Sequence, residues 1–206
     1  MISWTDIGIV LSAKRHGEKY KIVNIFTKEH GKFSAMVSNS KSNAFSIFSN
    51  VVIDYSTKTQ ESMGFWKLKS EKQDWIFFMK SENHVLVSQG ICFLLNKLLP
   101  LGAPYEKLFN FTKHLLGIFQ NFSKSDILLL YVYFEFVLLD NIGFGKRISD
   151  NFDLNLKFNS FLNLSETIDK NDFEKIKHSL SVTKNIIEDN LLKIDNYYRS
   201  SIIRLI

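Results

Sequence analysis

The sequence predicts an α+β protein in which a small β-barrel precedes an all-helical domain. The first observation is the stretch from Asp6 to Ser34, where two His-Gly turn signals, beginning at His16 and His30, separate three short segments rich in β-branched and aromatic residues. The second is a change to helical spacing of apolar residues from His84 onward. The third is an excess of positive charge confined to the β-rich part.

Five short strands are expected in the β-rich part. Three form a meander over residues 6–37, a fourth covers residues 50–57, and a fifth covers residues 65–68, with residues 75–78 as a further candidate for it. Five short strands with basic loops favour a Greek-key barrel of the oligonucleotide-binding (OB) type, whose open face commonly binds oligonucleotides. An SH3-like barrel fits the strand pattern almost as well.

Period-2 alternation gives the meander an expected polarity. In the first strand Ile7, Ile9 and Leu11 share one face. In the second strand Lys19 and Lys21 lie opposite the flanking aromatic and aliphatic residues. We therefore expect a sheet with an apolar side and a cationic side.

The helical part is expected to begin between Lys80 and Asn83, so that residues 1–80 form the barrel domain and residues 81–206 the helical domain. Helices are predicted over residues 84–99, 104–121, 127–142, 171–192 and 197–205, with an irregular polar segment over 145–170. Ser125 or Asp126 could cap the third of these helices, which is apolar nearly all round and should be central. Glu135 interrupts its apolar run, which is shorter than the ~20 residues of a membrane span, so no membrane partner is expected.

Charge is distributed unevenly along the chain. Residues 1–80 contain 12 Lys and Arg against 7 Asp and Glu, whereas residues 81–206 contain 14 of each. A localised basic field favours a polyanion such as nucleic acid, although a solubilising surface would show the same net charge. The single cysteine excludes an internal disulfide framework and fits a cytoplasmic location.

Catalytic motifs are missing from the sequence. It contains no phosphate-binding Gly-x-x-x-x-Gly-Lys loop, no Gly-x-Ser-x-Gly elbow and no His-Glu-x-x-His pair. Cys92 stands between Ile91 and Phe93, which is typical of a packed core residue rather than a nucleophile. We expect a binding protein without a cofactor, and not an enzyme.

The candidate DNA-binding residues are cations near the turns of the meander and in the loop after its third strand. They are Lys14, Arg15, Lys19, Lys21, Lys28, Lys32 and Lys41. Hairpin geometry should bring the first four together, where they would bind phosphates without reading sequence. Phe45 and Phe48 follow in the same loop, and aromatic side chains on such a surface can stack unpaired bases, although a position in the protein core is the alternative for each of them.

Three motifs resemble a known family. The opening Asp-x-Gly-Ile-Val-Leu (from Asp6), followed by Gly-Glu and then Phe-Thr-Lys-Glu-His-Gly-Lys-Phe-Ser (from Phe26), is similar to the start of the RecO family of bacterial DNA repair and recombination mediators. Phe134-Glu135, Leu138-Leu139 and Ile142-Gly143-Phe144 resemble its central helix. Ile187-Glu188 through Arg204-Leu205 resembles its closing segment.

The resemblance implies an N-terminal OB-fold and a C-terminal helical domain. Such a protein binds single- and double-stranded DNA, anneals complementary strands without ATP and joins RecR. It helps RecA to load onto DNA covered by single-stranded-DNA-binding protein, and captures the acidic C-terminal tail of that protein in its helical domain. The expected location is the bacterial cytoplasm, in association with the nucleoid.

The chain departs from the family pattern at three places. Only Lys41 remains where relatives have an Arg-rich run, and residues 145–161 are shortened and lack the four cysteines of the zinc site that many relatives carry, so no metal is expected. Tyr133 stands where a basic residue often precedes Phe-Glu. The tail pocket that the resemblance implies would then use Lys113, Lys124, Tyr133, Phe134 and Arg199.

Two other functions fit the sequence. One is a protein-interaction adaptor whose degenerate OB domain no longer binds nucleic acid, and the other is an RNA-binding OB module. Salt-dependent binding of single-stranded DNA would separate the mediator from the adaptor.

Overall fold

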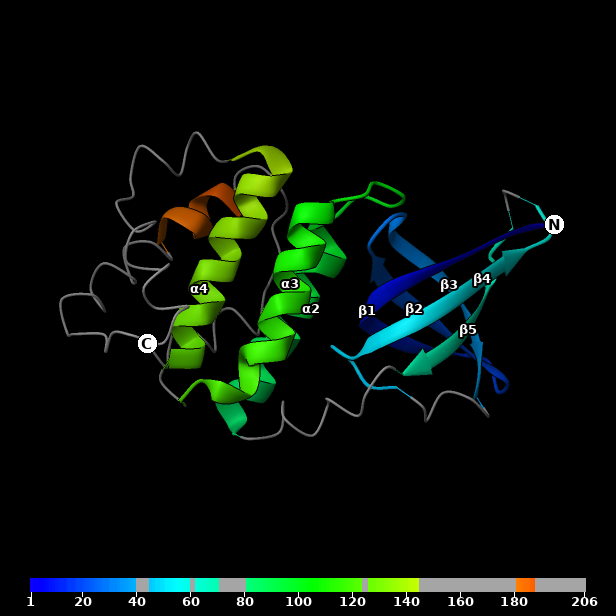
Figure 1. Ribbon diagram of the computed structural model, residues 1–206, viewed down its shortest axis with the longest axis horizontal. Coiled ribbons are helices and arrows are strands. Elements are labelled where there is room, and N and C mark those ends of the chain that lie inside the picture. Colours follow the sequence, from blue (N-terminus) through cyan, green and yellow to red (C-terminus); the bar gives the residue numbers. More distant parts are fainter. Residues whose placement is uncertain (40–44, 60–61, 71–80, 124–125, 145–180, 188–206) are drawn as a thin grey trace. The chain divides into compact units, whose positions relative to one another are not determined.

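The computed structural model describes residues 1–39, 45–59, 62–70, 81–123, 126–144 and 181–187 (Figure 1). The chain divides into two compact units, Met1–Phe122 and Ser123–Ile206. The first unit contains five strands followed by two helices, and the described part of the second is helical. The predicted α+β class is confirmed.

The five strands form a closed barrel. They are β1 (Ile2–His16), β2 (Tyr20–Thr27), β3 (Gly31–Ser38), β4 (Asn50–Thr57) and β5 (Phe65–Ser70), in the order β1-β2-β3-β5-β4. All neighbours are antiparallel except β3 and β5, and β1 pairs with β4 to close the barrel. This five-stranded Greek-key barrel is an OB-fold, as predicted. The further candidate for the fifth strand, residues 75–78, lies outside the described residues.

Strand β1 is longer than expected and is shared by both sides of the barrel. Its first half pairs with β4 and its second half with β2, and the register shifts by a bulge between Val10 and Ser12. A bulge bends a strand and increases its twist, which lets one strand serve two partners. The barrel core consists of Val10, Val23, Ile25, Ala35, Val37, Val51, Ile53, Tyr55 and Trp66.

The expected apolar and cationic sides of the meander are wrong for β2. Lys21 lies on the same face as Val23 and Ile25, which point into the barrel core. Its charge is tolerated because it sits near the end of β2, where it remains partly exposed. The opposite, outward-facing positions of β2 include Tyr20 and Ile22.

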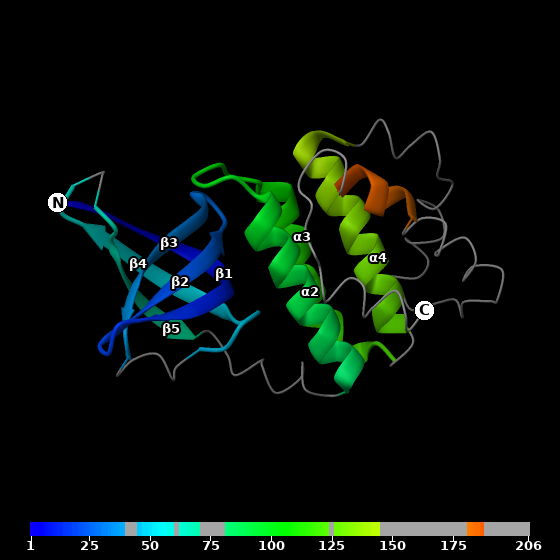
Figure 2. The same cartoon turned by 180° about the vertical axis from the view of Figure 1, so that it is seen from behind.

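Two helices pack against the barrel within the first unit (Figure 2). Helix α2 (Glu82–Leu98) is capped by Ser81, whose hydroxyl accepts a hydrogen bond from the His84 N–H. It contacts β1 and β2, and the Cys92 thiol donates to the Val10 carbonyl at 3.7 Å. Helix α3 (Glu106–Ile118) continues into a short 3-10 turn, η2 (Phe119–Asn121), and Phe109 packs edge-on against Phe26.

A polar network joins α2 to the barrel strands. The side-chain amide of Asn24 donates to the Asn96 side-chain oxygen at 2.9 Å, and the Ser34 hydroxyl donates to the Asn24 oxygen at 2.6 Å. Because these groups are partly buried, their hydrogen bonds fix the seating of α2. The expected division at residues 80–83 marks the change from strands to helices, but the compact units divide after Phe122. A helical domain of residues 81–206 therefore stays a prediction.

The second unit is built on α4 (Asp126–Leu139), which continues into a π-helical turn, η3 (Asp140–Phe144). The Ser123 hydroxyl accepts from the Asp126 N–H at 3.1 Å and so caps the helix in place of Asp126, while Ser125, the other expected cap, lies outside the described residues. Glu135 is fully buried and accepts a hydrogen bond from Thr183, in the helical segment 181–187, at 2.7 Å. The other expected C-terminal helix, 197–205, lies outside the described residues.

The segment Asp126–Phe144 is long and apolar enough to cross a membrane by length and composition alone. Most of it, 59%, is buried inside the protein, and a buried core helix passes the same test. The segment is therefore weak evidence for a membrane span.

Candidate nucleic-acid interface

A row of outward-facing side chains crosses four strands of the barrel. The strand register pairs Lys14 of β1 with Ile22 of β2, and Ile22 with Met36 of β3. It also sets Met36 beside Phe65 of β5. Adjacent positions along these strands point into the core, so alternation directs the row outward. We call this row, together with Tyr20, the outer face.

Two exposed aromatic side chains meet on the outer face. Tyr20 is 37% exposed and Phe65 is 44% exposed, and their ring centroids lie 5.8 Å apart in an edge-on arrangement. Single exposed apolar side chains are common on protein surfaces, but two large rings in contact form a contiguous apolar patch of the kind found at binding sites. Neither residue is among the site residues predicted from the sequence, because their contact depends on β5 lying beside β3.

Cations gather at the β1–β2 hairpin, next to the outer face. Lys14, Arg15 and Lys19 are exposed and Lys21 is partly exposed. The register sets Arg15 directly opposite Lys21. No carboxylate in the described part of the chain lies within ion-pair distance of these four. Like charges facing across a strand pair destabilise it, and a bound polyanion would relieve this repulsion.

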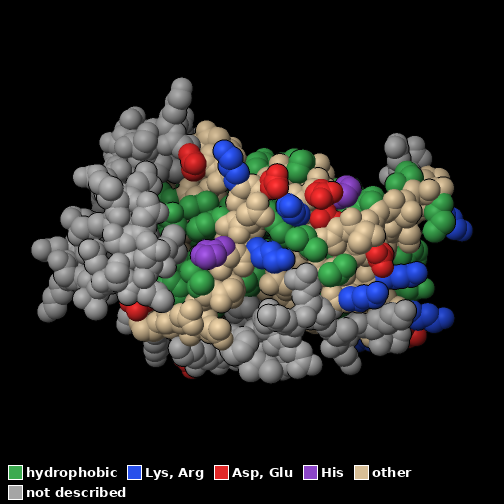
Figure 3. All heavy atoms as spheres, viewed as in Figure 1, with side chains coloured by type: hydrophobic (Ala, Val, Ile, Leu, Met, Phe, Trp, Pro, Cys, Tyr) green, Lys and Arg blue, Asp and Glu red, His purple; other side chains and the backbone are tan. Residues whose placement is uncertain are grey.

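Strand β5 adds two cations that are not among the DNA-binding residues predicted from the sequence. Lys67 and Lys69 are exposed and alternate with the buried Trp66, so they share the outward side of Phe65. Asp54 of β4 lies opposite Lys67 and is the acidic neighbour on this side. Figure 3 shows Lys and Arg side chains gathered over the part of the barrel formed by β4 and β5.

Two of the predicted DNA-binding lysines have structural partners instead. Lys28 forms an ion pair with Glu106 of α3 at 3.5 Å. Lys32 is only 8% exposed, and its ammonium donates to the Asn96 carbonyl at 2.6 Å, near the C-terminus of α2. Burial, with a smaller effect of the charge on Lys97, lowers the pKa of Lys32. The assignment of Lys32 to the DNA-binding set is therefore wrong, and Lys41 lies outside the described residues.

The aromatic residues expected to stack bases also belong to the protein core. Phe48 is 1% exposed and packs edge-on against Phe119 at 5.7 Å between ring centroids. Phe45 is partly buried against the barrel core. Of the two alternatives that the sequence left open for these residues, Phe48 takes the core position and Phe45 packs against the barrel core. Tyr20 and Phe65 are the exposed aromatic residues in the described part of the barrel.

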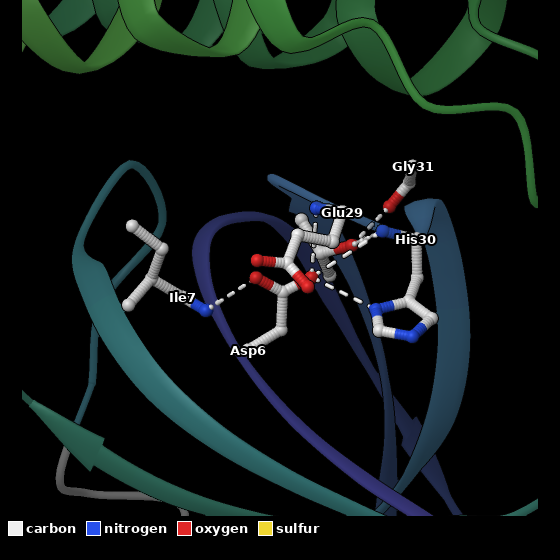
Figure 4. Close-up of polar contacts among 6 residues, drawn as sticks. Asp6, Ile7, Glu29, His30 and Gly31 are labelled. Atoms are coloured by element: carbon white, nitrogen blue, oxygen red, sulfur yellow. Dashed lines mark hydrogen bonds and ion pairs between the residues drawn. The ribbon is translucent and has the colours of Figure 1, made fainter.

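A buried carboxylate fixes the β2–β3 turn (Figure 4). Asp6 accepts hydrogen bonds from the backbone N–H groups of Ile7, Glu29 and His30, and its side chain pairs with His30 Nδ1 at 3.0 Å. The imidazole of His30 stacks on Trp4 at 3.8 Å. Burial would raise the pKa of the Asp6 carboxyl, but these hydrogen bonds outweigh it and hold the pKa below its usual value.

The predicted tail pocket is described only in part. Lys113 lies on α3 in the first unit, while Tyr133 and Phe134 lie on α4 in the second. Phe134 is fully buried, and burial raises the pKa of the half-buried Tyr133. Lys124 and Arg199 lie outside the described residues. The tail pocket and its assignment to these residues stay a prediction.

Comparison with known proteins connects this barrel to one family. Residues 1–65 match the family model "Recombination protein O N terminal". The chain is 27% identical over 148 residues to the DNA repair protein RecO of Wolbachia sp. subsp. Drosophila simulans, which covers 71% of this chain and 61% of that protein.

Other relatives give the same result. The DNA repair protein RecO of Rhodopseudomonas palustris (strain TIE-1) is 28% identical over 154 residues, covering 72% of this chain and 60% of that protein. That of Ruegeria sp. (strain TM1040) is 25% identical over 152 residues, covering 72% and 62%. The chain thus spans about three fifths of the length of these curated relatives. Residues 1–65, which form most of the OB-fold barrel, thus match the N-terminal model of the RecO family, and the chain is similar to RecO proteins over 71–72% of its length.

Proposed function

We propose that this chain is a DNA-binding protein of repair and recombination that works by binding and not by catalysis. The observation that carries the proposal is the β1–β2 hairpin, where Arg15 faces Lys21 and exposed Lys14 and Lys19 lie nearby without a carboxylate partner among the described residues. A DNA backbone supplies the missing negative charges and releases its condensed counterions. The same charges would serve single and double strands, since both carry phosphates.

The mechanism that follows is electrostatic. Two DNA strands repel each other through their phosphates, and a cationic surface that binds both lowers this repulsion. Annealing by this route needs no ATP and no reacting side chain.

The family supports a finer proposal. The chain would act with RecR in the bacterial cytoplasm, at the nucleoid, and help RecA to load onto strands covered by single-stranded-DNA-binding protein. The acidic tail of that protein would be held by the helical residues. The proposal of these partners rests on the similarity to the RecO family alone. Co-purification of the chain with each partner tests it directly.

The test of DNA binding is a titration of a labelled single-stranded oligonucleotide at two salt concentrations. The wild type should bind at micromolar concentration or tighter, with affinity that falls steeply as salt rises. Lys14→Glu combined with Lys19→Glu should reduce affinity at least tenfold, and each lost phosphate contact should lower the salt slope by about 0.7. Both side chains are exposed, so the fold should survive.

The matched control is Lys97→Glu combined with Lys107→Glu, which makes the same change of charge on exposed positions of α2 and α3. It should change affinity much less than the hairpin variant. Equal losses in the two variants would show that only net charge matters and would overturn the hairpin site. Titration of RNA of the same length compares the two nucleic acids.

A further inference from the structure

We propose that Tyr20 and Phe65 form a platform on which unpaired bases stack, so that the outer face distinguishes single strands from duplex. This inference rests on the proposed function, because it adds a base contact to the phosphate contacts of the hairpin. The two rings come from β2 and β5, strands that do not pair with each other, and meet across Met36 of β3.

The platform is held in place by the barrel itself. Phe65 is fixed between its register partners Met36 and Ser56, and the Met36 N–H donates to the Gly64 carbonyl at 2.9 Å. Next to Phe65, the indole N–H of the buried Trp66 donates to the Val23 carbonyl at 3.1 Å. A ring mounted on a rigid strand loses little freedom when a base stacks on it, which favours binding.

The charges around the platform indicate what covers it. Cations lie on both sides of the aromatic pair: Lys14 on β1 stands at one end of the row, and Lys67 and Lys69 follow Phe65 on β5. A second copy of this chain would bring the same cations against them, which disfavours a self-interface. A nucleic-acid strand instead offers phosphates to the cations and base faces to the rings.

The platform selects single strands for a geometric reason. In a duplex the faces of the bases are covered by their neighbours in the stack, and only the phosphates and groove edges are accessible. In a single strand every base has a free π-face, and stacking on an aromatic side chain tolerates any base. Two contributions should therefore be separable: the hairpin cations act on all DNA, and the two rings act only on unpaired bases.

The experiment compares two single strands of equal length and charge, oligothymidylate and the same backbone with abasic sites in place of the bases. The wild type should bind oligothymidylate about tenfold more tightly than the abasic strand. Tyr20→Leu with Phe65→Leu should remove this preference while leaving the affinity for the abasic strand and for duplex unchanged. Tyr20→Phe keeps the ring and should keep the preference.

Ile47→Ala is the control for loss of exposed apolar surface, because Ile47 is 44% exposed, like Phe65, and lies in the loop before β4. It should leave the preference intact. Equal binding of the two strands by the wild type would overturn the platform, yet leave phosphate binding by the hairpin standing. No binding to either strand would overturn the proposed function itself, so the two failures are distinguishable.

Discussion

At the scale of single residues, Asp6 shows how a local sequence motif produces a long-range constraint. Its carboxylate accepts from three backbone N–H groups, two of them on the turn after β2. The motif Asp-x-Gly was visible in the sequence, but its partner was not, because Asp6 and His30 are 24 residues apart. The side chain is 2% exposed, so its charge is stabilised by hydrogen bonds and not by water.

Replacing this carboxylate should weaken the barrel. Asp6→Asn is expected to lower the free energy of unfolding by about 2 kcal/mol at pH 7, because charged acceptors make the stronger hydrogen bonds. Asp54→Asn is the control, since the hydrogen bond that Asp54 accepts from Thr5 is exposed, and it should cost less than about 0.5 kcal/mol. Urea denaturation measures both, and equal effects would contradict the role of Asp6.

Asp6 should also make the stability of the protein depend on pH, with a direction that follows from its lowered pKa. Since the pKa of Asp6 is lower in the folded protein than its ordinary value of 3.8, its contribution is fully present above that value. It is lost as pH falls below 3.8 through the folded-state pKa. The difference in stability between wild type and Asp6→Asn should therefore shrink on acidification below pH 4, and a constant difference would contradict the linkage.

At the scale of elements, the β2–β3 turn is locked to the turn between α2 and α3. Gly31 has a φ of +72°, and a Cβ added there would lie 2.1 Å from the Ala103 carbonyl oxygen. The Gly102 N–H donates to the Lys32 carbonyl at 3.0 Å. A turn of the barrel and a turn of the helices thus approach each other by backbone, which only glycine permits.

Alanine substitutions at Gly31 and Gly17 separate the stability cost of the left-handed backbone conformation from the cost of a steric clash. Gly31→Ala should cost clearly more stability than Gly17→Ala, whose φ is +64° but which has nothing within 4 Å of an added Cβ. Gly17→Ala should cost about 1 kcal/mol for the left-handed backbone alone. The excess for Gly31→Ala, expected to exceed 1 kcal/mol, measures the contact with Ala103. Thermal unfolding compares them, and equal losses would rule out the contact.

The positions of the strands and helices along the chain are the most predictable feature of this protein. The strands and the helices α2, α3 and α4 fall where alternation, turn signals and helical spacing place them, because these signals are local. The functional surface was less predictable. Lys32 was selected for its charge, whereas its burial under α2 is set by pairings far apart in sequence. Phe65 is not predictable as a site residue because only the parallel pairing of β5 with β3 brings it beside Tyr20.

At the scale of the whole molecule, the compact units suggest where a stable fragment ends. Phe26 of β2 is fully buried and packs on Phe109 of α3, and Ile9 and Leu11 of β1 are buried although they lie outside the barrel's own core. A fragment ending at residue 80 would expose this apolar surface. The barrel thus depends on α2 and α3 for part of its burial.

This dependence predicts the behaviour of two fragments. Residues 1–122 should unfold cooperatively in denaturant, whereas residues 1–80 should aggregate or unfold without a sharp transition. Circular dichroism and size-exclusion chromatography provide the measurement. A monomeric, cooperatively folded fragment of residues 1–80 would instead support the domain division expected from the sequence.

The double pairing of β1 has a consequence for how the protein is made. The ribosome synthesises β1 before the other four strands of the barrel, yet half of β1 has no partner until β4 has also emerged. Through that interval its backbone donors and acceptors are open to pairing with other nascent chains. Strand β1, which joins β2 to β4 in the finished barrel, is thus exposed to wrong pairing during translation.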